Sequence, residues 1–194
     1  RADRNTRSGL SMGRGSEASS PPPPQAVIGL GNPVAEYDQT RHNAGFWWVD
    51  ALADRAGVHL RPDARLKGEL GRLEMAGTSV WLFKPNTFMN HSGQAVEAFD
   101  SYYHLEPAAL LIAHDELDLP VGTVRLKQGG GHGGHNGLRD IMARLGGDFT
   151  RLRIGIGHPG HRDQVVSYVL HPPGREERRQ IDEALMSAAA VFPD

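Results

Sequence analysis

Two residues that lie far apart in the sequence, His42 and Asp115, could together activate a water molecule. His42 stands at the predicted start of a helix, and Asp115 follows a short buried strand. A carboxylate can orient a histidine that acts as a general base. Because the positive end of a helix dipole disfavours a protonated imidazole, we expect His42 to be neutral there and able to accept a proton. The chain has no Cys and no Gly-x-Ser-x-Gly motif, so water is the expected nucleophile.

Two histidine pairs, His132 with His135 and His158 with His161, raise the alternative of a metal site. Without Cys, zinc would need three His or carboxylate ligands and an open position. A spacing of three residues brings two ligands together only on a helix, whereas the neighbouring Gly and Pro predict loops. We therefore expect no metal and no other cofactor. Loop hydrogen bonds suit His158 and His161 better than His135.

The segment 128–136 is rich in glycine, which is costly to order unless the backbone must approach something closely. It contains a Gly-x-Gly-x-x-Gly spacing, as does the segment 155–160. Counted from its last glycine, Gly134, the first lacks an acidic residue about 20 positions later, and the second does not clearly open a helix. Neither therefore predicts a dinucleotide site.

Three asparagines, Asn32, Asn90 and Asn136, lie at predicted junctions between strands, turns and helices. Asn in such places commonly caps a helix or forms a turn. Alternatively, the three amides could converge on a peptide-like group or a developing oxyanion. Taken alone, the residues favour caps and turns.

The elements that must position these residues alternate between short apolar strands and amphipathic helices. This order predicts an α/β fold, a single three-layer domain with a twisted mixed, mostly parallel sheet flanked by helices. Ligands of such domains bind beyond the carboxyl ends of the strands, where the polar and Gly-rich segments fall. The predicted strands are 26–30, 69–75, 79–83, 110–113, 123–127 and 152–156, and the predicted helices are 41–57, 92–105, 137–145 and 175–191.

The first 25 of the 194 residues differ from the rest in composition. They contain few apolar side chains and end near four consecutive prolines, so we expect 1–25 to be a disordered leader, part of which could derive from an expression vector. Residues 26–194 suffice for one domain. No apolar run approaches the ~18 residues of a membrane span.

The net charge of −2 conceals an uneven distribution. Residues 121–162 carry seven basic and two acidic side chains, whereas residues 26–120 carry seven basic and thirteen acidic ones. A local basic segment can steer an anionic ligand, although arginines of this kind are also typical of a solvated face.

Six strings resemble the bacterial-type peptidyl-tRNA hydrolase family, in family order and from about residue 27 to the last helix. The resemblance implies hydrolysis of the ester that joins a peptide to the terminal ribose of tRNA, a reaction that recycles tRNA during translation. The strings are Gly29-Leu-Gly-Asn-Pro33, Thr40-Arg-His-Asn-Ala-Gly45, Lys84-Pro-Asn-Thr-Phe-Met-Asn90, His114-Asp-Glu-Leu-Asp-Leu-Pro120, Gly131-His-Gly-Gly-His-Asn-Gly137 and Leu152-Arg-Ile-Gly-Ile-Gly-His-Pro-Gly160.

The resemblance assigns catalytic roles to residues already singled out. It implies that His42 deprotonates the attacking water and that Asp115 orients His42. The amides of Asn90 and Asn136 would hold the peptide backbone, the water and the tetrahedral intermediate. Asn32 would distinguish a blocked peptidyl nitrogen from a free ammonium group.

The resemblance also implies a substrate surface, namely for the acceptor arm and 3′ end of peptidyl-tRNA. Val34 departs from the family, which often has Gly there, so the turn beside Asn32 could differ.

We expect a cytoplasmic monomer that does not bind membranes. The alternative functions are an RNA-binding module that has kept the fold and a metal-dependent amide or ester hydrolase. The expected contacts are Tyr37 and Phe88 with the acceptor end, Met89 and His135 lining the cleft, and Arg125, Lys127 and Arg153 with tRNA phosphates.

Overall fold

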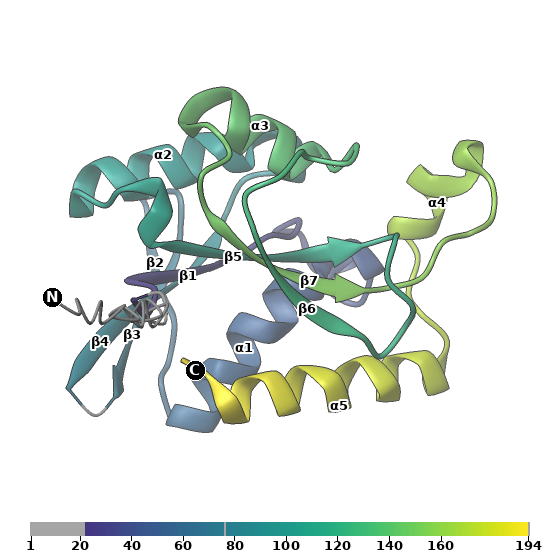
Figure 1. Ribbon diagram of the computed structural model, residues 1–194, viewed down its shortest axis with the longest axis horizontal. Coiled ribbons are helices and arrows are strands. Elements are labelled where there is room, and N and C mark those ends of the chain that lie inside the picture. The colour runs from purple at the N-terminus through teal and green to yellow at the C-terminus, as the bar shows by residue number, and fades with distance from the viewer. Residues whose placement is uncertain (1–21, 76, 194) are drawn as a thin grey trace, which may run out of the picture.

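Seven strands form one mixed sheet in the computed structural model, which describes residues 22–75 and 77–193 (Figure 1). The strand order is β2-β3-β4-β1-β5-β7-β6. The strands are β1 (Ala26–Gly29), β2 (Arg61–Asp63), β3 (Gly68–Met75), β4 (Thr78–Pro85), β5 (Leu110–Glu116), β6 (Val124–Gln128) and β7 (Thr150–Gly155).

The four central strands, β4, β1, β5 and β7, are parallel, and β3 and β6 run antiparallel to them. β1 is buried along its whole length, as is most of β5, which explains their continuous apolar sequences. The predicted mixed α/β sheet is therefore confirmed.

Helices cover both faces of the sheet, in the three layers that the sequence predicts (Figure 1). One core packs α1 and α5 against the sheet, and the other packs α2 and α3 against its opposite face. Within the second core, Phe83 of β4 stacks on Phe99 of α2 at 4.7 Å between ring centroids. The helices are α1 (Ala44–Ala56), α2 (Ser92–Tyr103), α3 (Asn136–Leu145), α4 (Val165–Val169) and α5 (Arg175–Val191).

Two glycines allow α1 to approach the sheet beside the site. A Cβ on Gly29 would collide with the carbonyl oxygen of Gly45, and a Cβ on Gly45 would collide with that of Ala113. The close approach brings the segment just before α1 to the end of β5, where Asp115 lies.

The structure adds elements that the sequence does not predict. β2 consists of Arg-Pro-Asp and α4 of five residues, and both are too short for a hydrophobic period to emerge. The predicted helix 41–57 begins with a 3-10 turn, Arg41–Asn43, before α1, and it ends as expected at Gly57 in the left-handed conformation.

Most of the expected leader, 1–25, lies outside the described residues. Within its described part, Gln25 is already joined to the sheet, because its N–H donates to Ala109 O at 2.9 Å and its carbonyl accepts from Trp81 at 3.0 Å. Among the described helices, none has the length and apolar content needed to cross a lipid bilayer.

Candidate active site

A cleft of about 890 Å³ opens at the carboxyl ends of β1, β5 and β7. Of the sequence-predicted site residues, Arg125 alone is not in its lining. Those that do line it are Asn32, Tyr37, His42, Phe88, Met89, Asn90, Asp115, Lys127, His135, Asn136 and Arg153.

At the floor of the cleft, the Asp115 carboxylate lies between two imidazoles. Its Oδ2 is 2.9 Å from His42 Nδ1, and its Oδ1 is 2.8 Å from His135 Nε2. His42 comes from the 3-10 turn before α1, and His135 is the residue before α3, on the opposite face of the sheet. The end of β5 therefore joins groups from both helical layers. The three side chains are between 3% and 11% exposed.

The hydrogen-bond partners fix the tautomers of both rings. An ionised carboxylate only accepts, so His42 Nδ1 and His135 Nε2 each carry a proton. His135 Nδ1 accepts the N–H of Leu138 at 3.3 Å and is therefore unprotonated. His42 Nδ1 is committed to Asp115, which leaves its Nε2 as the acceptor. This is the tautomer that a general base requires.

His42, Asp115 and His135 could also be considered as metal ligands, because one ligand atom of each lies within 4.8 Å of the others. A metal on His135 Nε2 would move the ring proton to Nδ1, which faces the N–H of Leu138. Two donors would then oppose each other. The donor set thus fits a proton-filled network better than a metal site. His132, the other member of the pair weighed as metal ligands, is not part of this group, and its Nδ1 accepts from Gly134 N.

Charge rather than the helix dipole sets the protonation of His42. Burial lowers its pKa, but the charge of Asp115 and the hydrogen bond to it outweigh burial and raise the pKa above the ordinary 6.5. The net shift is therefore opposite to the one expected from the place of His42 at a helix start. For Asp115, burial acts to raise the pKa, but His42 and His135 hold it well below its usual range.

Asn32 is held rigidly at the end of β1. Its backbone N–H donates to Asn43 Oδ1 and its carbonyl accepts from Asn43 Nδ2, both at 2.9 Å. Its own Oδ1 accepts the N–H of Met89 at 2.8 Å. With the amide oxygen occupied, the Nδ2 donors remain for a ligand. Val34 has ordinary extended backbone, with φ of −82°, so this turn does not require Gly there.

Asn90 and Asn136 come from two helical elements that pack against each other in the cleft wall. Asn90 lies in a 3-10 turn, Met89–His91, and Asn136 opens α3. Both side chains are exposed to the cleft. Asn136 Oδ1 is 3.4 Å from Arg139 Nη1, a long contact that turns the amide nitrogen away from Arg139. Asn32, Asn90 and Asn136 thus line the same cleft, and convergence of their amides on one group stays a prediction.

The glycine-rich segment is held by Arg151, a residue that the sequence analysis missed. The Arg151 guanidinium donates to the carbonyls of Gly130, at 2.6 Å, and of Gly131. Four glycines of the segment have positive φ, which only Gly adopts without strain. Arg151 is 3% exposed and lies between this loop and the ring of Phe149. In the sequence, Arg151 lies on a predicted strand edge beside other basic residues such as Arg153. Nothing in that pattern distinguishes it as the residue that holds the loop.

The basic residues differ in their availability. Arg125 of β6 is paired in register with Arg153 of β7, and Lys127 with Arg151, so their side chains share one face of the sheet. Arg153 Nε, however, is 2.8 Å from Glu116 Oε1. Its charge is partly neutralised by that pair, which the sequence analysis did not anticipate. Among the described cations of the cleft, Lys127, Arg151 and Arg162 make no ion pair with a carboxylate, in contrast to Arg153.

The second histidine pair, His158 and His161, makes local contacts. His158 Nδ1 accepts from Gly160 N and His161 Nδ1 from Asp163 N, which confirms the predicted loop hydrogen bonds. His114 is different, because it is 2% exposed and, within the described part of the chain, its Nε2 has no partner. Burial and the neighbouring His135 lower the pKa of His114 to about 4.

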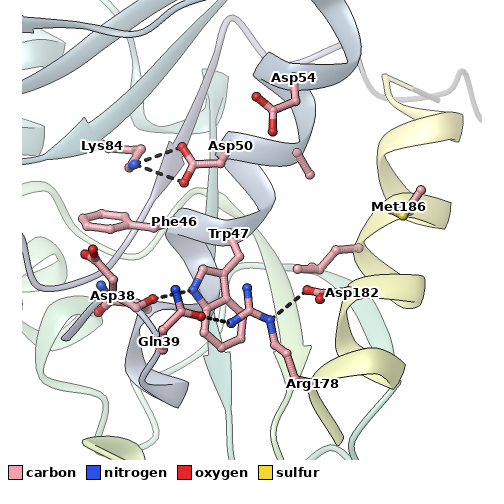
Figure 2. Close-up of a pocket in the computed structure, with 13 residues that line it drawn as sticks. Asp38, Gln39, Phe46, Trp47, Asp50, Asp54, Lys84, Arg178, Asp182 and Met186 are labelled. Atoms are coloured by element: carbon pink, nitrogen blue, oxygen red, sulfur yellow. Dashed lines mark hydrogen bonds and ion pairs between the residues drawn. The ribbon is translucent and has the colours of Figure 1, made fainter. Parts of the chain in front are cut away.

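A second cavity, of about 500 Å³, lies between α1 and α5, and neither His42 nor Asp115 is part of its lining (Figure 2). On one side Lys84 binds Asp50, and on the other Arg178 stacks on Trp47 and binds Asp182. Most of the charged side chains in the wall of this cavity are paired with each other. This pairing suits a structural role for them rather than ligand binding.

Comparison with known proteins shows the family to which the chain is similar. A sequence model of the family described as peptidyl-tRNA hydrolase matches residues 26–193. The chain is 53% identical over 169 residues to a peptidyl-tRNA hydrolase of Neisseria meningitidis serogroup A, covering 87% of this chain and 88% of the relative. The peptidyl-tRNA hydrolase of Halorhodospira halophila is 54% identical over 168 residues, 86% of this chain and 87% of its own. The crystal structure of the Acinetobacter baumannii peptidyl-tRNA hydrolase superposes with a TM-score of 0.84 at 51% identity, over 86% of this chain and 85% of that one.

Proposed function

The chain belongs to the peptidyl-tRNA hydrolase family, and on that basis we propose that it cleaves the peptide–ribose ester of peptidyl-tRNA with His42 as the general base. The observation that carries this mechanism is the Asp115 carboxylate, 2.9 Å from His42 Nδ1, which leaves Nε2 as a proton acceptor at the cleft floor.

In the first step, a water molecule attacks the ester carbonyl carbon while His42 Nε2 takes one of its protons. The carbonyl oxygen becomes an oxyanion, and the developing imidazolium is stabilised by Asp115. Amide N–H donors of Asn90 and Asn136 stabilise the oxyanion and hold the peptide backbone. In the second step, the carbon–oxygen bond to the ribose breaks, and His42 returns its proton to the ribose oxygen. The products are the free peptide acid and tRNA.

Asn32 selects substrates whose terminal nitrogen is blocked. Its Nδ2 donors can bind the carbonyl of an acylated nitrogen, because its Oδ1 is occupied by Met89 N. A free ammonium group offers no acceptor and adds a like-signed charge to the donors. Residues of the cleft wall support the rest of the substrate: Tyr37 and Phe88 contact the acceptor end, and Met89 and His135 line the peptide path.

The acceptor arm binds over the β6–β7 edge, through phosphate contacts of Lys127, Arg125 and Arg153. The net positive segment 121–162 contributes the attraction for the polyanion. Since Arg153 is already paired with Glu116, its phosphate contact requires exchange of that partner. The enzyme acts as a cytoplasmic monomer, and residues 26–194 form the catalytic domain.

Hydrolysis of N-acetyl-aminoacyl-tRNA, compared with that of the unblocked aminoacyl-tRNA, tests the proposed function. We expect release of the N-acetyl-amino acid and much slower hydrolysis of the unblocked ester. Binding of tRNA without turnover would instead support an RNA-binding module that has kept the fold.

A further inference from the structure

Arg41, the residue immediately before His42, is buried although it is charged. Its side chain is 11% exposed. A buried guanidinium is costly unless its donors and its charge are satisfied, so its partners indicate what it is for. Two of those partners, Tyr168 and His171, lie in and just after α4, and the third is Glu177 of α5, whose Oε1 lies 3.6 Å from Arg41 Nη2.

The guanidinium and the backbone of Arg41 both bind the end of α4. Arg41 Nη1 donates to Tyr168 O at 3.0 Å and to His171 O at 3.3 Å, and the backbone N–H of Arg41 donates to His171 O at 3.1 Å. The last carbonyls of a helix lack partners within the helix, and a cation there is favoured by the helix dipole. Arg41 therefore acts as the C-terminal cap of α4.

Tyr168 of α4 completes the attachment. The Arg41 guanidinium carbon lies 3.8 Å from the centroid of the Tyr168 ring, and the Tyr168 hydroxyl donates to Ile156 O at 2.5 Å. One side of α4 is thus fixed to the turn that carries His42 and to the residue after β7. A helix of five residues has no stability of its own, so these contacts set its position.

α4 also contributes to the wall of the catalytic cleft. Val165, Val166 and Val169 line the cleft, and Val166 is 69% exposed. An exposed valine that lines a cleft is available to contact substrate. The chain thus connects the base His42, through its neighbour Arg41, to an apolar surface of the same cleft.

We propose that Arg41 is a positioning residue that holds α4 as a preformed substrate wall. The proposal rests on the proposed function for the identity of the substrate. The attachment of α4 by Arg41 does not depend on that function. Without the Arg41 cap, substrate must order α4 as it binds, which raises KM. The reacting atoms contact His42 and not Arg41, so kcat is largely preserved.

Arg178 supplies a matched control. Like Arg41, it lies over an aromatic ring: its guanidinium carbon is 3.5 Å from the centroid of the Trp47 ring. It also binds Asp182 at 2.9 Å and Gln39 at 2.8 Å (Figure 2). It lines the second cavity and not the catalytic cleft. Arg178→Lys therefore loses comparable contacts without releasing α4.

The test compares Arg41→Lys with Arg178→Lys in kinetics on N-acetyl-aminoacyl-tRNA and in amide hydrogen exchange of the segment 165–171. We expect Arg41→Lys to raise KM about fivefold to tenfold, with kcat within about twofold, and to accelerate exchange in that segment. Arg178→Lys should change neither KM nor that exchange. An unchanged KM in Arg41→Lys, or an equal rise in Arg178→Lys, would overturn the proposal.

Tyr168→Phe provides a second variant should Arg41→Lys fold poorly. It removes the hydroxyl contact to Ile156 but keeps the ring under the guanidinium. We expect a smaller KM rise and faster exchange of 165–171. The exchange experiment needs no turnover, so absence of activity in the wild type would refute the proposed function, whereas unchanged exchange in both variants would refute the role of Arg41.

Discussion

Asp115 Oδ2 lies 2.9 Å from His42 Nδ1, and the Asp115 side chain is 3% exposed. Residues 73 positions apart thus meet in a nearly closed site, where a charge and a hydrogen bond act with little competition from water. This pair has both kinetic and pH consequences.

Asp115→Asn should lower kcat by about 10²- to 10⁴-fold, because an amide can present its N–H to Nδ1 and so favour the wrong tautomer of His42. The remaining activity should show a shifted pH profile. Asp115 raises the pKa of His42, so the acid limb of wild-type kcat/KM should have its midpoint above pH 6.5 and move to lower pH in the variant. Steady-state kinetics between pH 5 and 9 measure both effects, and an unmoved acid limb would exclude Asp115 as the source of the raised pKa.

Sequence reasoning located this site well because its residues lie at the ends of recognisable elements. β1 and β5 are apolar runs followed by polar residues, and the carboxyl ends of parallel strands meet at one edge. The strand ends alone therefore place Asn32 and Asp115 near each other, whereas the pairing of Asp115 with His42 was implied by the family resemblance.

Features that depend on pairing between distant side chains could not be predicted in this way. Arg153 is bound by Glu116, and Arg151 by the carbonyls of the glycine-rich segment, although all the arginines of this region look alike in the sequence. The pKa of His42 followed its buried neighbour and not its place at a helix start. α4 is too short to show a hydrophobic period, which concealed one wall of the cleft.

Asn32→Ala should relax the preference for blocked substrates. In the wild type, Asn32 Oδ1 is occupied by Met89 N, whereas the Nδ2 donors are available to an acyl carbonyl. The variant loses these donors. We expect the ratio of kcat/KM for N-acetyl-aminoacyl-tRNA to that for free aminoacyl-tRNA to fall about tenfold. Parallel assays of the two esters on one tRNA give this ratio. If both rates fell by the same factor, Asn32 would serve binding in general and not selection.

His114 should make the protein sensitive to acid. Its folded pKa of about 4 lies below the ordinary 6.5, so its contribution to stability is present above pH 6.5 and is lost as the pH falls towards 4. Between pH 7.5 and 5 this amounts to about 2 kcal/mol of the free energy of unfolding. Urea unfolding of wild type and His114→Asn at both pH values measures it. The variant should lose less stability on acidification, and equal losses would contradict the assignment.

Chelation should leave turnover intact. His135 Nδ1 already accepts from Leu138 N, so the ring cannot bind a metal through Nε2 without opposing two donors. Enzyme treated with EDTA and then returned to the Mg²⁺ buffer of the tRNA substrate should show the kcat of untreated enzyme. Loss of turnover that Zn²⁺ but not Mg²⁺ restores would instead support a metal-dependent hydrolase built on His42, Asp115 and His135.

The most direct measurement is single-turnover hydrolysis of N-acetyl-aminoacyl-tRNA by wild type and His42→Ala, with the folded state of each confirmed by circular dichroism. Removing the base should slow the chemical step about 10³-fold while the affinity for the substrate changes little. A His42→Ala enzyme that hydrolyses the ester at close to the wild-type rate would contradict His42 as the group that activates water.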